Sequence, residues 1–193
     1  MERRKIMWYN TKMRIVIAAP FYPPDTEDMA VYAKELAENL AKRHDVSVVT
    51  YARLPEESSG VRIYSVNKRL PLIFRLARFT ATLFCAVRKA DILYAENGAS
   101  VEVPSALVAL TTRRPFIIHF DDKTAIARSS KNLFLKMAQR FAQKRAISEV
   151  SDIPRRPPEI LPFGLPPEKE LVEYRASWEN HMQKLTDIFN ETK

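Results

Sequence analysis

Residues 13–50 read MRIVIAAPFYPPDTEDMAVYAKELAENLAKRHDVSVVT, and this stretch decides the fold. The run 13–19 is apolar without alternation, as expected of a strand that is buried on both faces of a parallel sheet. A proline-rich loop stops the strand, and apolar residues then recur at helical spacing as far as Leu40. Residues 45–51 form a second β-branched run. The stretch therefore predicts a strand-helix-strand unit.

The same alternation of short apolar runs and helical patterns continues through the rest of the chain. Strands are predicted at 61–64, 91–94, 115–120 and 159–161, and helices at 72–89, 101–112, 130–146 and 168–190. The predicted fold class is α/β, a single Rossmann-like domain with a mainly parallel sheet flanked by helices. We expect residues 1–12 to be an N-terminal extension, 13–166 to form this domain, and 167–193 to form a helix that packs back on it.

Composition limits the ligands that the chain can bind. The net charge of +8 favours an acidic partner, which could be anionic lipid, a phosphorylated acceptor or nucleic acid. No recognised nucleic-acid motif accompanies the charge, so nucleic acid is the least favoured of the three. There are only three glycines, so neither a G-x-G-x-x-G loop nor a P-loop can be written. This excludes binding of NAD, FAD or ATP by those loops.

Cysteine and histidine usage points away from metal and disulfide chemistry. The three histidines lie far apart in the sequence, so we expect no metal site and no cofactor. The single cysteine, Cys85, lies in an apolar stretch and is expected to be a small core residue in a protein of the reducing cytoplasm. No apolar run approaches the roughly 18 residues that span a bilayer.

Several segments together resemble one family. The opening strand with its Pro-aromatic-Pro-Pro loop, ADILYAEN at 90–97, RPFIIHFDD at 114–122, MAQRFAQKRA at 137–146 and EILPFGLP at 159–166 are similar to successive units of family-4-like glycosyltransferases with the GT-B fold. These segments match the N-terminal, acceptor-side domain of that family. The resemblance implies a half of a GT-B fold and a nucleotide sugar as the donor substrate.

The chain departs from the family after residue 166. In place of a donor domain, the sequence goes almost directly to a segment with Ser177-Trp178-Glu179, which resembles the last helix of GT-B enzymes and is alternatively any amphipathic capping helix. The family's donor domain supplies basic residues for the sugar diphosphate and a glutamate pair for the ribose. The resemblance therefore implies that donor binding needs a separate donor-domain protein or a homodimer.

The strand ends supply the candidate site residues. Glu96, Asn97 and Asp122 follow predicted parallel strands on the side where open α/β sheets bind ligands, so we expect them to contact the acceptor. Asp121 aligns with the family's frequent histidine, and His119 lies two residues earlier, so both are candidate catalytic residues. The alternatives are a solvated turn or helix cap for the two aspartates and a structural role for His119.

The first loop also departs from the family pattern. Glu27 and Asp28 stand where the family usually has two glycines, which let backbone amides approach the donor phosphate. Two carboxylates would repel that phosphate. This argues against ordinary donor binding at the loop.

The predicted helix at 72–89 carries a basic stripe beside a strongly apolar surface. We expect Arg69, Phe74, Arg75, Arg78 and Phe79 to contact an anionic membrane, which would place the protein in the cytoplasm as a peripheral protein at the inner face of the membrane. The alternative is a helix that is buried between the sheet and the terminal helix.

Two leading functions remain open on the sequence, and a third, weaker alternative is a basic nucleic-acid-binding domain. The first is glycosyl transfer from a nucleotide sugar to a lipid-linked or glycan acceptor, with the donor domain supplied by a partner. The second is a non-catalytic, membrane-associated binding or scaffold protein derived from a glycosyltransferase, which the missing donor domain and the acidic first loop favour.

Overall fold

The computed structural model describes residues 12–120, 133–158 and 167–192, and its described part divides into a unit that ends at Ser151 and a unit that begins at Asp152. The first unit contains a six-stranded sheet in the order β3-β2-β1-β4-β5-β6, in which every neighbouring pair is parallel. Its strands are β1 (Arg14–Ala19), β2 (Asp45–Thr50), β3 (Val61–Ser65), β4 (Ile92–Glu96), β5 (Phe116–His119) and β6 (Ser148–Val150). The predicted Rossmann-like α/β class is confirmed.

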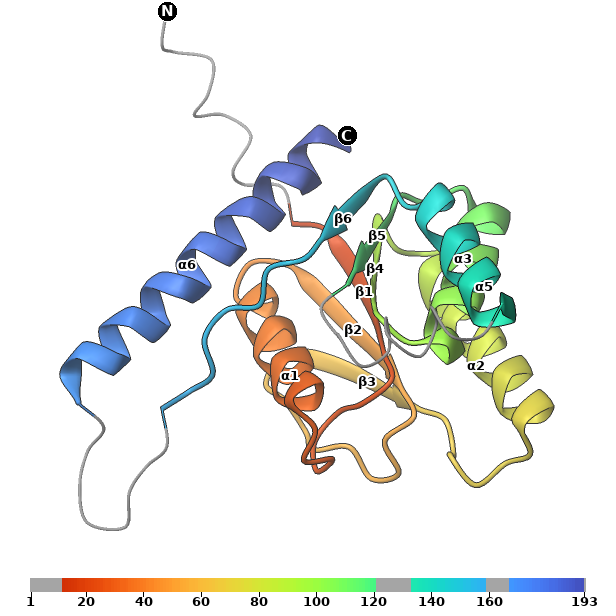
Figure 1. Ribbon diagram of the computed structural model, residues 1–193, viewed down its shortest axis with the longest axis horizontal. Coiled ribbons are helices and arrows are strands. Elements are labelled where there is room, and N and C mark those ends of the chain that lie inside the picture. The colour runs from red at the N-terminus through yellow and green to blue at the C-terminus, as the bar shows by residue number, and fades with distance from the viewer. Residues whose placement is uncertain (1–11, 121–132, 159–166, 193) are drawn as a thin grey trace, which may run out of the picture. The chain divides into compact units, whose positions relative to one another are not determined.

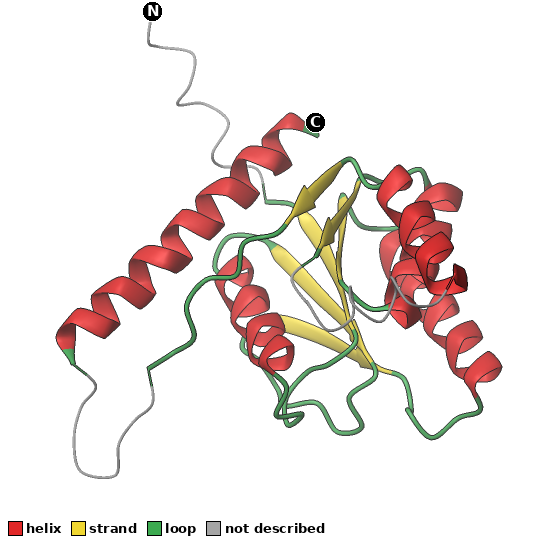
Figure 2. Ribbon diagram, viewed as in Figure 1, coloured by secondary structure: helices red, strands yellow, loops and turns green. Residues whose placement is uncertain are grey.

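Helices cover both faces of this sheet. Helix α1 (Asp28–Ala41) lies on one face, and α2 (Leu72–Val87), α3 (Ala99–Thr112) and α5 (Leu133–Arg145) lie on the other (Figure 1). The central strands are consequently buried along their length: all of β4 and all of β1 except Arg14 lack appreciable exposure. This arrangement explains why these strands are continuous apolar runs. Figure 2 shows the yellow strands enclosed between the red helices.

Most predicted elements agree with the structure to within one or two residues, but β6 was not predicted. Its three residues, Ser-Glu-Val, pair with β5 through Ile117↔Ser148 and His119↔Val150. So short and polar a segment has no periodicity that distinguishes a strand from a loop. The predicted strand at 159–161 and the N-terminal extension lie outside the described residues, apart from Lys12 at the end of the extension.

Two predictions about α2 were wrong. Phe79, expected at a membrane surface, is completely buried and stacks on Tyr51 with ring centroids 4.4 Å apart. Cys85, expected in the core, is exposed. The cause of both errors is the helix rotation, because Leu83 and Val87 repeat the position of Phe79 at four-residue intervals and hold that side against the sheet. Cys85 lies on another side of the helix, outside this contact.

The second unit consists of α6 (Glu168–Glu191) and the extended segment that begins at Asp152. One carboxylate oxygen of Asp152 accepts a hydrogen bond from Lys184 Nζ at 2.9 Å and lies 3.2 Å from His181 Nδ1. The backbone N–H of Arg155 donates to Ser177 Oγ at 2.9 Å. These bonds connect the extended segment to α6, so the boundary between the two units lies before residue 166. Packing of α6 on the first domain stays a prediction.

The described helices include none that is both long enough and apolar enough to cross a membrane. In α6, the longest of them, charged residues occur along most of the helix. Its buried residues Trp178, His181, Leu185 and Phe189 share one side of the helix.

The burial of Phe79 predicts a large difference between two phenylalanines of one helix. Replacing Phe79 by Ala leaves a cavity under the sheet and is expected to lower the free energy of unfolding by about 3–5 kcal/mol. The matched control is Phe74→Ala, which removes a side chain that is 68% exposed and should change stability by about 0.5 kcal/mol or less. Urea denaturation of the two variants measures both values. Equal losses would contradict the observed rotation of α2.

Candidate functional site

The carboxyl ends of β4 and β5 bring two candidate site residues together. Glu96 is the last residue of β4 and His119 the last of β5, and the two are register partners. Register partners on adjacent parallel strands direct their side chains to the same face of the sheet. Here this is the face covered by α1, because His119 stacks on Tyr32 of that helix with ring centroids 4.8 Å apart. Glu96 and His119 are thus neighbours.

Two tyrosines complete this cluster beneath α1. The hydroxyls of Tyr32 and Tyr94 are hydrogen-bonded at 2.7 Å, and the Tyr94 ring lies 6.2 Å from that of His119. Both tyrosines and His119 are buried. The imidazole therefore contacts aromatic rings in a buried cluster, which restricts its rotation. Neither tyrosine was predicted as a site residue, although Tyr94 precedes Glu96 by two residues and must share its face.

Glu96 is the most unusual polar group of the cluster. It has no exposed surface, and neither carboxyl oxygen has a hydrogen-bond partner among the described residues. Burial raises the pKa of the Glu96 carboxyl well above its ordinary value of 4.5. A carboxyl in this environment favours the neutral form, because an ionised one would lie uncompensated in a medium of low polarity. Neutral Glu96 can donate a hydrogen bond as well as accept one.

A second buried acid, Glu102 in the first turn of α3, contacts the turn that follows β4. Gly98 has a φ of 155°, which a residue with a side chain rarely adopts, and its backbone N–H donates to Glu102 Oε1 at 2.9 Å. Burial raises the pKa of Glu102, and the hydrogen bond from Gly98 opposes that rise. A Cβ atom at Gly98 would lie 3.5 Å from Pro20 Cγ. The turn therefore approaches the loop that follows β1.

That first loop is fixed by its own polar contacts. The hydroxyls of Tyr22 and Ser58 are hydrogen-bonded at 2.8 Å, and Lys68 Nζ lies 2.6 Å from a carboxylate oxygen of Asp25. Glu27 and Asp28 follow, exposed at the amino end of α1. The positive end of the helix dipole thus meets the chain's own carboxylates. A phosphate would have to compete with them for this position.

The other residues predicted to contact the acceptor, to act in catalysis or to contact a membrane are buried, exposed or outside the described part of the chain. Asn97 is buried beside Glu96 in the sequence, whereas Asp121 and Asp122 lie outside the described residues. Of the five residues predicted to contact a membrane, Arg69, Phe74 and Arg78 are exposed and Phe79 is buried. Arg75 is folded against the protein: its guanidinium donates to the Lys68 carbonyl at 3.1 Å and lies 5.7 Å from the centre of the Tyr51 ring.

Metal binding has no support in the part of the chain that the structure describes. Within it, no three His, Cys, Asp or Glu side chains are grouped so that they could hold a metal ion. Among the described residues, the buried groups of this cluster are the imidazole of His119, the carboxyl of Glu96 and the phenols of Tyr32 and Tyr94.

The fold and the polar strand ends define a Rossmann-like domain of the GT-B type. Among solved structures, HepE from Anabaena in complex with UDP-glucose is similar with a TM-score of 0.53 and 17% identity, over 71% of this chain and 36% of HepE. A protein of Listeria monocytogenes described as a UDP-N-acetylglucosamine 2-epimerase is similar with a TM-score of 0.52 and 12% identity, over 73% of this chain and 39% of that one. These values show a shared fold. The chain spans less than half the length of either protein.

The family itself is shown by the sequence. The family model of the glycosyl transferase 4-like domain matches residues 29–151, so this chain belongs to that family. The match covers α1 through β6, which includes Glu96 and His119. A comparison with curated proteins gave no match.

The buried carboxyl of Glu96 predicts an unusual dependence of stability on pH. Its pKa is higher in the folded chain than in the unfolded chain, so its contribution to stability is complete below 4.5 and is lost as pH rises toward the folded pKa. The loss can reach about 1.4 kcal/mol per pH unit. Glu96→Gln cannot ionise, so its stability relative to the wild type should increase between about pH 5 and about pH 8.

Thermal unfolding across this pH range measures the effect. Glu57→Gln is the matched control, because Glu57 is exposed and its loss should leave the pH dependence unchanged. If Glu96→Gln and the wild type gave parallel curves, Glu96 would not be held neutral by burial.

Proposed function

We propose that this domain is the acceptor-side half of a glycosyltransferase, which transfers a sugar from a nucleotide sugar to a lipid-linked or glycan acceptor. The observation that carries the proposal is the pairing of Glu96 with His119 at the strand ends, within the region that the family model matches. Ligands of open α/β sheets bind at this edge. The donor domain comes from a separate protein or from a second copy of the chain.

In this proposal His119 is the base that activates the acceptor. Its imidazole takes the proton of an acceptor hydroxyl as the oxygen attacks the anomeric carbon, and the nucleoside diphosphate leaves. Tyr32 and Tyr94 hold the ring in place. Glu96 is the register partner of His119 in the sheet. In its ionised form it can stabilise the imidazolium, and in its neutral form it can donate a hydrogen bond to the acceptor. Asp121 remains a second candidate base.

Burial of the cluster sets a condition on this function. Glu96 and His119 have no exposed surface, so an acceptor reaches them only if binding of the acceptor or of the donor domain uncovers them. Such completion of a site on closure is common where two domains bind one substrate pair.

The first loop supports the proposed need for a separate donor domain. Glu27 and Asp28 occupy the amino end of α1, where a phosphate would otherwise bind, and Lys68 beside the loop is already paired with Asp25. The loop therefore offers a sugar diphosphate no net positive charge. HepE, which is similar in fold, has been solved with UDP-glucose, and this supports a nucleotide sugar as the donor.

A second function is favoured by the same burial and by the same two acids. If the cluster stays covered, the domain is a non-catalytic binding or scaffold protein that keeps the fold without the transfer reaction. The two functions differ in whether an acceptor reaches Glu96 and His119.

Saturation-transfer NMR distinguishes them. We expect short-chain glycolipids or oligosaccharides from a panel of acceptors to bind the chain alone, and a panel of nucleotide sugars to give no signal, because the donor phosphate is repelled at the first loop. His119→Gln should lower acceptor affinity by about tenfold or more, since a buried polar contact is lost. Glu57→Gln is the control and should bind as the wild type does.

Each other outcome has a definite meaning. A nucleotide sugar that bound the chain alone would contradict the need for a donor domain. Silence of all acceptors would contradict the acceptor-side role and leave the scaffold function. Circular dichroism of His119→Gln checks that a loss of binding is not a loss of fold.

We also propose that the tip of α2 contacts an anionic membrane that holds the acceptor, at the inner face of the cytoplasmic membrane. Leu72, Ile73 and Phe74 are 57%, 79% and 68% exposed in one turn. Arg69 and Arg78 are exposed on either side of this turn. Apolar side chains flanked by cations bind the interface of an anionic bilayer.

Vesicle sedimentation tests this contact. The double variant Ile73→Ser/Phe74→Ser should bind anionic vesicles at least about tenfold more weakly, because insertion of each apolar side chain contributes about 1–2 kcal/mol. Leu54→Ser removes an equally exposed residue of another loop and should not change binding. Equal binding of the wild type to neutral and anionic vesicles would refute the membrane contact.

A further inference from the structure

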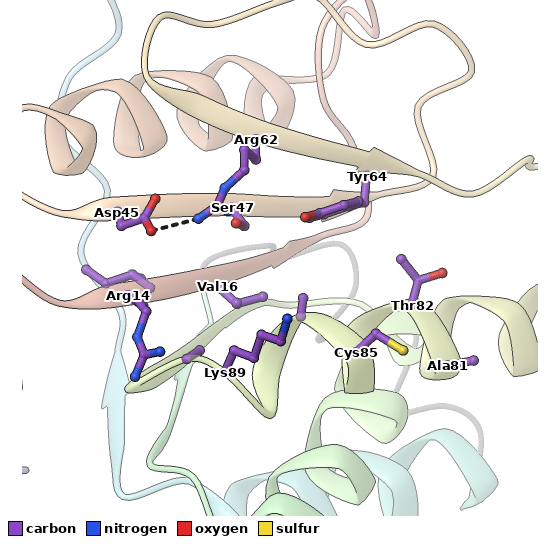
Figure 3. A pocket seen from close by; sticks show the side chains of 13 residues that line it. Arg14, Val16, Asp45, Ser47, Arg62, Tyr64, Ala81, Thr82, Cys85 and Lys89 are labelled. Carbon is purple, nitrogen blue, oxygen red and sulfur yellow. Dashed lines mark hydrogen bonds and ion pairs between the residues drawn. The ribbon is translucent and has the colours of Figure 1, made fainter.

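A pocket of about 540 Å³ opens at the end of the sheet opposite to Glu96 and His119. Its floor and one wall come from the first residues of three neighbouring strands, which include Arg14, Ser47 and Arg62. Register places these side chains on one face, because Arg14 pairs with Asp45 and Ser47 with Arg62. The other wall is α2 (Figure 3).

The sequence explains why this space is not filled. The side of α2 that lines the pocket carries the small residues Ala81, Cys85 and Ala86, which cannot reach across to β3. Among the strands, helix α2 packs mainly on β2 and β1, so it leaves the face of β3 that bears Arg62 and Tyr64 largely uncovered. The pocket volume lies within the range of about 300–1,000 Å³ that small-molecule sites occupy.

Charge in the pocket is positive. Arg14 Nη2 lies 3.1 Å from Asp91 Oδ1, and Arg62 Nη2 lies 2.7 Å from Asp45 Oδ2, so each of these arginines is paired with a carboxylate. Lys89 is the surplus cation, since its ammonium group makes no ion pair or hydrogen bond with another described residue. Figure 3 shows its side chain between α2 and the strands, with Arg62 and Tyr64 on the opposite side.

We infer that this pocket binds a small organic anion, with the acidic group on Lys89 and an aromatic or apolar part between Tyr64 and Val16. An anionic group can also contact the outward N–H groups of Arg14 and Arg62, whose pairing leaves other guanidinium donors available. Tyr64 offers a half-exposed ring for stacking, and Val16 a buried apolar floor. The ligand would bind independently of the acceptor, because the two sites lie at opposite ends of the strands.

A fluorescent anion provides the test. The probe is 8-anilinonaphthalene-1-sulfonate, and N-phenyl-1-naphthylamine is its counterpart, which has the same rings without the sulfonate. The Ile73→Ser/Phe74→Ser background removes the exposed apolar tip of α2 as a competing site. In this background we expect the anion to bind at least about tenfold more tightly than its neutral counterpart.

Two charge reversals locate the binding. Lys89→Glu should weaken binding of the anion by about tenfold or more. Lys136→Glu is an equal charge change at an exposed position of α5 and should weaken binding by less than about twofold. If both reversals had the same effect, the attraction would come from the overall charge of the chain and the pocket proposal would fail.

Cys85 supplies a second, independent measurement. It is the only cysteine, it is exposed, and it lines the pocket, so a neutral alkylating reagent such as iodoacetamide reports occupancy of this place alone. A saturating concentration of the anion should slow alkylation by about fivefold or more, as expected when a bound molecule excludes the reagent. An unchanged alkylation rate would show that the anion binds elsewhere and would overturn the inference.

Discussion

The parallel pairing of β1 with β4 and of β4 with β5 is the constraint on which the rest of the structure depends. Parallel neighbours cannot be joined by a hairpin, so the chain must cross a face of the sheet between them, and the crossing helices bury the strands. All strands then end at one edge. Glu96 and His119, far apart in the sequence, become neighbours for this reason alone, and α1 above them supplies the ring of Tyr32.

The same constraint explains which parts of the fold could be predicted from the sequence. A strand that is buried on both faces is expected to be a nearly continuous apolar run, and β1 and β4 carry that pattern over most of their length. Strand β6 is polar and three residues long, and it exists only because β5 offers it an unpaired edge. The rotation of α2 likewise depends on packing against the rest of the fold. Almost every side of that helix is apolar, so the sequence alone does not distinguish the buried Phe79 from the exposed Cys85.

The candidate site was predictable in position but not in environment. The rule that ligands bind where parallel strands end identifies Glu96, Asn97 and His119 without any structure. Glu96 lies on the face of the sheet that α1 covers, and α1 comes from a distant part of the chain, so the raised pKa of its carboxyl could not be inferred from residues near it in the sequence. Tyr32 could not be assigned to the site either, because at its helical position it is indistinguishable from the core residues around it.

The acids at this edge are not electrostatically equivalent, and their difference bears on how a donor could bind. Burial raises the pKa of Glu96 and of Glu102, so both favour the uncharged form and contribute less to repulsion of a sugar diphosphate. Glu27 and Asp28 are exposed at the amino end of α1, where their charge acts at the place that a phosphate would take. Salt screens that charge only beyond about 8 Å. A diphosphate at that place would lie within this distance, so the exposed Glu27 and Asp28 would oppose its binding more strongly than the two buried acids.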